Sequence, residues 1–223
     1  MSGINFSITK HWLFDFDGTL VDSMPYWSSC MISVLDDHNV PHGNDLINII
    51  TPLGTAGTIA YFQKLGLEMS YNDIKNEIAS KLTPFYLDII PEKKNVIQCL
   101  QHMKGEGFKL HVLTASPHGW LNPCLKRLGM YELFENVWSS DDFGTGKTDP
   151  EIYISAAKKI GVNISDVTFL DDNINADKTA KLAGMKVIGV YDETSKHDEE
   201  IMRKTLDFYV HDFKELEDLI FKS

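Results

Sequence analysis

The stretch at residues 11–23, HWLFDFDGTLVDS, restricts the possible folds of this chain more than any other. Residues 12–16 form a short apolar run typical of a buried β-strand, interrupted and followed by the carboxylates Asp15 and Asp17 and then by Gly18. In an extended backbone, side chains at i and i+2 point to the same side, and removing carboxylates from water is costly unless they are paired or bound to a metal. The stretch therefore indicates either a metal-binding strand end or an acidic corner exposed to solvent.

Length and composition are those of a globular protein. The 223 residues can bury one large core, or one core and a small second domain. Hydrophobic residues make up 43% of the chain, but no apolar run approaches the length of a membrane span. The first ten residues, MSGINFSITK, lack a signal pattern, and the three cysteines lack ligand spacing. We therefore expect a cytoplasmic protein with reduced thiols and no membrane partner.

Net charge limits the classes of ligand. The formal charge of −11 disfavours nucleic acid and anionic membrane surfaces as partners, so an anionic substrate would need a locally positive pocket or a metal. Arg127 and Arg203 are the only arginines in the sequence. Bidentate clamping of a second phosphate or carboxylate is therefore largely unavailable. The sequence does not indicate an oligomeric state.

The segment at residues 24–90 is predicted to be a small all-helical domain. Helical patterns occur at 25–40, 44–50, 55–65 and 71–82, separated by glycine and proline, and no strand is evident among them. Pro25 is expected near the start of the first helix, and Ser70 with Asp73 resembles a capping box.

From residue 91 onward, helical and strand patterns alternate. Helices are predicted at 92–104, 119–128, 150–160 and 174–183, and strands at 109–114, 137–139, 167–170 and 186–190, before a final helix or strand pair. This order predicts an α/β fold with a Rossmann-like parallel sheet and helices on both faces, which strand 12–16 must join. We expect residues 1–23 and 91–223 to form this core, with the helical domain inserted after the first strand.

Polar side chains follow the predicted strands, where parallel α/β sheets bind ligands. They are Asp15, Asp17, Thr114, Asp171 and Asp172, and Lys147 lies between them in GTGKTDP. Each has an ordinary structural explanation alone: Asp171 and Asp172 could cap a helix, and Lys147 could be a solvated loop residue. Together they offer carboxylates for a hard metal, a hydroxyl and an ammonium, which favours a functional site.

Four segments in this order, DFDGTLVDS, VLTAS, GKTDPEIY and FLDDNINADKTAKLAGM, resemble the motifs of the haloacid dehalogenase superfamily. The similarity is to its helical-cap branch, which includes phosphoglycolate phosphatase and beta-phosphoglucomutase. The resemblance implies that Asp15 is the nucleophile, Asp17 the general acid and base, and Thr114 and Lys147 the groups that hold the phosphoryl group. It also implies Mg²⁺ bound by Asp15, the main-chain carbonyl of Asp17, and Asp172, under a cap that closes over the site. The role of Asp171 stays open.

The resemblance implies a magnesium-dependent phosphatase that hydrolyses a small phosphorylated metabolite through an aspartyl phosphate. Asp17 favours phosphoryl transfer, since the dehalogenase branch lacks this second aspartate. A sugar phosphate mutase is the alternative, but that branch has a histidine near Trp27 and an arginine near Gly57, which this chain lacks. A non-catalytic phosphate- or metal-binding module is a further alternative, against which the general acid and the cap both argue.

Overall fold

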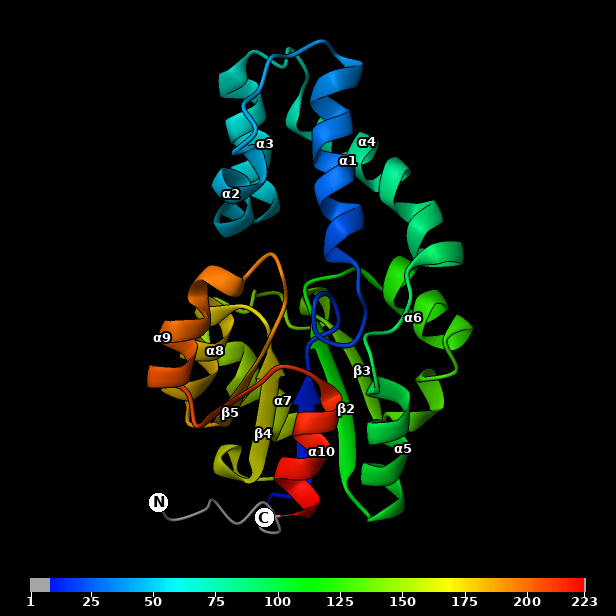
Figure 1. Ribbon diagram of the computed structural model, residues 1–223, viewed down its shortest axis with the longest axis vertical. Coiled ribbons are helices and arrows are strands. Elements are labelled where there is room, and N and C mark those ends of the chain that lie inside the picture. Colours follow the sequence, from blue (N-terminus) through cyan, green and yellow to red (C-terminus); the bar gives the residue numbers. More distant parts are fainter. Residues whose placement is uncertain (1–8, 223) are drawn as a thin grey trace. The chain divides into compact units, whose positions relative to one another are not determined.

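The computed structural model describes residues 9–222, except for the side chains of Asn48 and Pro52. This chain divides into two compact units (Figure 1). One is the helical unit, Ser23–Ile90, and the other, the sheet unit, combines the described residues before Ser23 with those after Ile90. Residues 1–8 and 223, at the ends of the predicted core, lie outside the described part of the chain.

The sheet unit contains a six-stranded parallel sheet with the strand order β3-β2-β1-β4-β5-β6. Its strands are β1 (His11–Phe14), β2 (Lys109–Thr114), β3 (Asn136–Ser139), β4 (Val167–Asp171), β5 (Lys186–Val190) and β6 (Phe208–Val210). The strand that comes first in the chain is therefore central, between β2 and β4. The order reverses direction there, which is where parallel α/β sheets open a ligand site.

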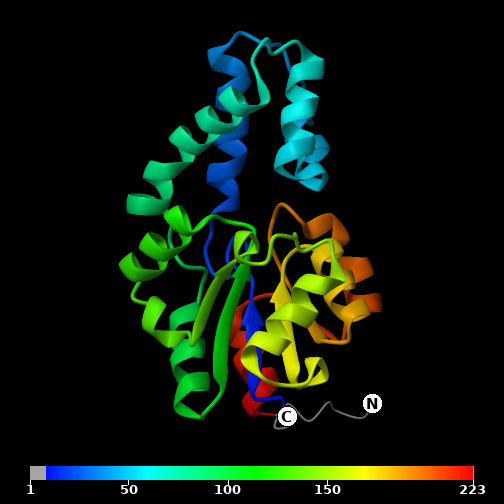
Figure 2. The ribbon, with the colours of Figure 1, turned by 180° about the vertical axis from the view of Figure 1, so that it is seen from behind.

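Helices cover both faces of this sheet. They are α5 (Val96–Gly105), α6 (His118–Arg127), α7 (Pro150–Ile160), α8 (Ile174–Ala183), α9 (Glu199–Thr205) and α10 (Phe213–Phe221). Helices α5 and α10 lie on one face (Figure 1), and α7 lies on the other (Figure 2). Side chains alternate accordingly along β1: Leu13 belongs to a buried cluster with Tyr153 and Ala180, whereas the ring of Phe14 lies 6.3 Å from that of Phe213. The predicted fold class is confirmed.

The helical unit consists of α1 (Met24–Asp37), α2 (Leu46–Ile50), α3 (Gly54–Leu65), α4 (Tyr71–Pro84) and a π-helical turn, Phe85–Ile89. Pro25 lies in the first turn of α1, and the Ser70 hydroxyl accepts a hydrogen bond from the Asp73 amide at 3.2 Å, as the capping pattern predicted. Among the described residues of this unit there is no strand. The helices described in both units are all too short or too polar to cross a membrane.

Two predicted boundaries differ from the structure near the join between the units. The first strand ends at Phe14 rather than residue 16, because the chain then turns, with the amides of Leu20 and Val21 both donating to the Phe16 carbonyl. Helix α5 begins at Val96 rather than residue 92, because Asn95 adopts a left-handed conformation with φ +65°. The segment before α5 instead bonds to the turn after β1, since the Lys93 amide donates to the Leu20 carbonyl at 3.0 Å.

Candidate active site

The polar residues singled out in the sequence lie at the carboxyl edge of the sheet. Asp15 directly follows β1, and its amide donates to the Leu170 carbonyl at 2.8 Å, so it continues the pairing with β4. Thr114 is the last residue of β2, and Asp171 is the last residue of β4. Lys147 precedes α7. Because the strands are parallel, their carboxyl ends bring these segments to one edge.

Three buried carboxylates meet at this edge. Asp15, Asp171 and Asp172 each present an oxygen within 4.8 Å of the others, and their exposed fractions are 4%, 0% and 7%. Burial raises the pKa of Asp171 to about 7, and burial together with the charges of Asp171 and Asp15 raises the pKa of Asp172 well above its usual value. Carboxylates that disfavour each other's ionisation are stabilised by a cation, and a set of oxygen ligands fits a hard divalent ion.

Lys147 supplies a fixed positive charge beside these carboxylates. Its Nζ lies 2.7 Å from Asp15 Oδ1 and 2.7 Å from Asp171 Oδ2. Burial favours the neutral amine, but the carboxylates of Asp15 and Asp171 outweigh it and raise the pKa of Lys147. The backbone here is anchored by the Tyr153 hydroxyl, which lies 3.1 Å from the carbonyls of both Lys147 and Ala176. Asp171, whose role the sequence left open, is thus one of the two partners of this lysine.

Asp17 has a different set of contacts from Asp15. The Ser116 hydroxyl donates to Asp17 Oδ2 at 2.5 Å, and the Ser116 amide donates to Thr114 Oγ1 at 3.1 Å. The regular strand ends at Phe14, although the Asp15 amide still pairs with β4, and each of the two acids has its own side-chain partner. The carboxylate of Asp17 is held beside the segment after β2, and the carboxylate of Asp15 contacts Lys147.

Gly18 lets the turn after β1 approach Asp172 closely. Its φ is +75°, and a Cβ atom at this position would lie 2.5 Å from Asp172 Oδ2. The neighbouring Thr19 hydroxyl donates to Asp172 Oδ1 at 3.1 Å. The group that the glycine approaches is therefore a carboxylate of the protein.

Lys93 is a structural residue of this edge that sequence reasoning missed. Its Nζ donates to the carbonyls of Gly18 at 2.6 Å and Tyr191 at 2.7 Å, and it pairs with Asp192 at 3.0 Å. It therefore ties the turn after β1 to the loop after β5. Nothing in the dipeptide Lys93–Lys94 distinguishes this lysine from a solvated one, so no sequence signal could have identified it.

Asp177 is a second residue that was missed. It lies in α8, is fully buried, and neither of its carboxylate oxygens has a hydrogen-bond partner among the described residues. Burial raises its pKa, and the charges of Asp171 and Asp172 raise it further. A weak signal existed: Asp177 lies three residues after Ile174 and three before Ala180, and both of these apolar residues are buried.

Comparisons with known proteins show what this chain is similar to. The family model described as haloacid dehalogenase-like hydrolase matches residues 12–190. A phosphorylated carbohydrates phosphatase from Thermotoga maritima is 25% identical over 177 residues, covering 79% of this chain and 82% of that protein. A phosphoglycolate phosphatase from Psychrobacter arcticus is 24% identical over 187 residues, covering 80% and 81%. Among solved structures, CbbY from Rhodobacter sphaeroides in complex with phosphate has the same fold, with a TM-score of 0.79, 20% identity, and coverage of 93% and 96%.

Proposed function

The chain belongs to the haloacid dehalogenase-like hydrolase family, and on this basis we propose that it hydrolyses small phosphate monoesters with Asp15 as the nucleophile. The observation that carries the proposal is the position of Asp15, buried at the end of the central strand, 2.7 Å from Lys147 and within a group of three carboxylates. A buried carboxylate beside a cation and a candidate metal site can approach a phosphate anion that it would otherwise repel. The similarity to two phosphatases of other organisms supports the same reaction.

The first half of the proposed reaction transfers the phosphoryl group to the protein. An oxygen of Asp15 attacks phosphorus in line with the ester oxygen, the bond to that oxygen breaks, and an aspartyl phosphate forms. Asp17 gives its proton to the departing alkoxide, so that a neutral alcohol leaves. The short hydrogen bond from Ser116 holds the Asp17 carboxyl group in place.

The second half releases phosphate and restores the protein. Asp17, now ionised, takes a proton from a water molecule whose oxygen attacks the phosphorus of the aspartyl phosphate. The bond between phosphorus and the Asp15 oxygen breaks, which regenerates the carboxylate and frees inorganic phosphate. The proton taken from water leaves Asp17 in its starting, protonated form. The net reaction therefore consumes one ester and one water and yields one alcohol and one phosphate.

The remaining residues stabilise charge on the phosphoryl oxygens. Lys147 supplies a positive charge, and the buried Thr114 hydroxyl, which accepts a hydrogen bond from the Ser116 amide, keeps its own proton to donate. Mg²⁺ would be held by the carboxylates of Asp15 and Asp172 and the main-chain carbonyl of Asp17, and when bound it would reduce repulsion between the nucleophile and the phosphate.

Hydrolysis is favoured over mutase chemistry by the charge of the helical unit. Residues 24–90 contain three lysines and no arginine, against seven acidic residues. A mutase must bind a second phosphate on the same sugar, which this balance disfavours.

The test is phosphate release from a panel of phosphate monoesters, with Mg²⁺ or with a chelator. We expect release that requires Mg²⁺ and that falls by more than about a thousandfold in Asp15→Asn while the folded structure is retained. Asp166→Asn is the matched control, because Asp166 precedes β4 and so lies at the opposite end of that strand from Asp171. Turnover that survives in Asp15→Asn would exclude this residue as the nucleophile. Interconversion of sugar phosphates without phosphate release would indicate the mutase.

A further inference from the structure

The ammonium group of Lys93 joins two loops at the carboxyl edge of the sheet. It donates to the carbonyls of Gly18 at 2.6 Å and Tyr191 at 2.7 Å, and to Asp192 Oδ2 at 3.0 Å. An ammonium has three protons, so these three acceptors use its full donor capacity. The side chains of Lys93 and Asp192 are only 17% and 4% exposed, which distinguishes this connection from a solvated surface ion pair.

Both ends of this connection are fixed by further hydrogen bonds. Asp192 Oδ1 accepts from the Thr194 amide at 2.9 Å and from the Thr194 hydroxyl at 2.7 Å, which leaves Oδ2 for the lysine. The Lys93 amide donates to the Leu20 carbonyl at 3.0 Å. Lys93 therefore holds the turn after β1 twice, by its main chain at Leu20 and by its side chain at Gly18.

The turn that Lys93 holds is the one that lies against Asp172. A Cβ atom on Gly18 would lie 2.5 Å from Asp172 Oδ2, and the Thr19 hydroxyl donates to Asp172 Oδ1 at 3.1 Å. Asp17, the residue before Gly18, carries the main-chain carbonyl proposed to bind the metal. A displaced turn would therefore disturb two of the three proposed metal ligands at once.

The charge of Lys93 acts in the opposite direction from its hydrogen bonds. A cation near a metal site repels the metal, so loss of the ammonium charge alone would strengthen metal binding. Asp192 balances this charge at close range. Burial and three nearby carboxylates raise the pKa of Asp172, each by more than Lys93 lowers it. The position of the turn is therefore expected to matter more than the repulsion.

We propose that Lys93 is a positioning residue for the metal site, which holds the Gly18 turn where Asp172 and the Asp17 carbonyl can bind one ion. It acts through the turn and binds neither the ion nor the phosphate. This role rests on the proposed function, which supplies the metal site. Its consequence is that removing a positive charge weakens the binding of a cation.

The test is binding of Mn²⁺, followed by the loss of the EPR signal of the free ion, because Mn²⁺ prefers the same oxygen ligands as Mg²⁺. We expect Lys93→Met to weaken Mn²⁺ binding about tenfold or more, as is typical when a partner that orients metal ligands is lost. The double variant Lys93→Met, Asp192→Asn removes both charges and should weaken binding to a similar extent. Because it leaves no unpaired carboxylate buried, it is also expected to be more stable than Lys93→Met alone. Unchanged or stronger binding in the double variant would overturn the proposal.

Two other lysines control for stability and for charge. Lys181 lies 3.0 Å from Asp207, which precedes β6 and so lies at the sheet edge opposite to Asp15. Lys181→Met should bind Mn²⁺ as wild type does, whatever stability it loses in urea unfolding. Lys94→Met removes a charge from the exposed neighbour of Lys93 and should not weaken binding. Weakening of the same size in Lys181→Met or Lys94→Met as in Lys93→Met would overturn the proposal.

Asp172→Asn separates failure of the metal site from failure of the role of Lys93. Normal Mn²⁺ binding in Asp172→Asn would place the ion elsewhere and overturn both. Loss of binding in Asp172→Asn, with normal binding in the double variant, would overturn the role of Lys93 alone. Weakened binding in both variants, without hydrolysis of any phosphate monoester by wild type, would support the role of Lys93 and overturn the phosphatase.

Discussion

Asp172 is the residue at which the proposed chemistry and the packing of the backbone are most tightly linked. Its carboxylate accepts a hydrogen bond from Thr19, shares a site with Asp15 and Asp171, and lies against Gly18. The position of one carboxylate therefore depends on the absence of a single methyl group on the opposing turn. In a close-packed interior such an atom cannot be added without displacing its neighbour.

Gly18→Ala should weaken metal binding more than it weakens the fold. Alanine in the left-handed region costs about 1 kcal/mol of unfolding free energy at any such glycine, but at Gly18 the new methyl group also has to displace Asp172. Gly129→Ala is the matched control, because Gly129 has φ +71° and nothing within 4 Å of a Cβ atom. Urea unfolding with and without Mg²⁺ measures both effects. A normal Mg²⁺ response in Gly18→Ala would contradict the argument.

The residues that sequence reasoning identified differ from those it missed in how far their chemistry depends on the fold. Asp15 follows a buried strand, and Thr114 and Asp171 are the last residues of theirs, so each is visible in the sequence as a polar residue where an apolar run ends. Lys93 has its role through carbonyls at positions 18 and 191, which only the fold brings to it. Such a role leaves no local pattern, because the sequence around Lys93 looks like that around a solvent-exposed lysine.

At the scale of elements, the kind of element was more predictable than the residues at which it begins and ends. Strands β2 (KLHVLT) and β5 (KVIGV) have the predicted bounds, because each is a short, mostly apolar run that closely follows a glycine. Helix α4 was expected to end at residue 82, before Pro84, but the chain stays helical through Pro84 and continues as the π-helical turn Phe85–Ile89. Proline has no amide hydrogen to donate and perturbs the regular hydrogen bonding of a helix. Tertiary packing therefore decides whether a helix ends before a proline or continues through it.

Strands β1, β2 and β3 are also joined by a row of stacked rings. The rings of His11 and His111 lie 5.6 Å apart, and those of His111 and Trp138 lie 6.0 Å apart, each pair within 8° of parallel. His111 Nδ1 accepts a hydrogen bond from Asn136 Nδ2 at 2.9 Å, so Nε2 carries the proton and lies 3.3 Å from His11 Nδ1. Burial, together with the neighbouring His11, lowers the pKa of His111 to about 4.

Because His111 is buried in this row of rings, the free energy of unfolding should fall as the pH is lowered. In the unfolded chain His111 titrates near 6.5, and in the folded protein near 4, so between these values the unfolded state binds more protons. The contribution of His111 to the free energy of unfolding, about 2–3 kcal/mol, is complete above pH 6.5 and is lost as the pH falls toward 4. Urea unfolding between pH 7 and pH 4.5 should show a weaker pH dependence in His111→Gln than in wild type. His197→Gln, at an exposed position, should match wild type, and equal slopes for His111→Gln and wild type would refute the prediction.

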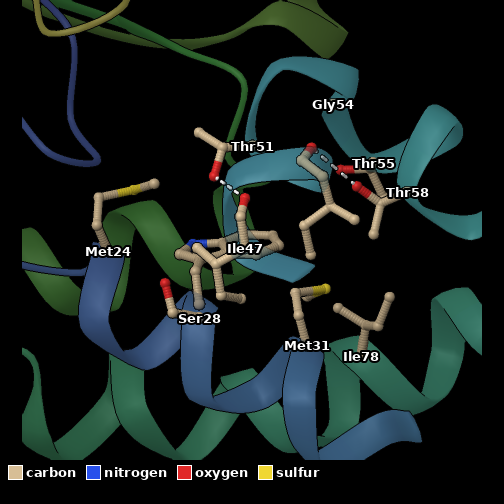
Figure 3. Close-up of a pocket in the computed structure, with 11 residues that line it drawn as sticks. Met24, Ser28, Met31, Ile47, Thr51, Gly54, Thr55, Thr58 and Ile78 are labelled. Carbon is tan, nitrogen blue, oxygen red and sulfur yellow. Dashed lines mark hydrogen bonds between the residues drawn. The ribbon is translucent and has the colours of Figure 1, made fainter. Parts of the chain in front are cut away.

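At the scale of the molecule, the chain passes between its two units twice, after Asp22 and after Ile90. The carboxylates proposed to bind the metal all belong to the sheet unit, and an apolar pocket lined by Met24, Met31 and Ile47 belongs to the helical unit (Figure 3). The charged candidate site and the apolar cavity thus belong to separately packed parts of the chain. The absence of strand patterns from residues 24–90 is visible in the sequence, whereas the pocket is not, because it depends on which faces of four helices meet.

Mg²⁺ should therefore stabilise the sheet unit selectively. A ligand stabilises only those states in which its site is folded, by about 2.7 kcal/mol at a concentration one hundred times its dissociation constant. Local opening of the helical unit leaves Asp15 and Asp172 in place, so Mg²⁺ does not oppose it. Hydrogen exchange should show amides of β1 and β4 becoming more protected with Mg²⁺, amides of α1 and α4 unchanged, and no effect in Asp172→Asn. Equal protection of both units would mean that they unfold as one cooperative body, and an undiminished effect in Asp172→Asn would place the ion elsewhere.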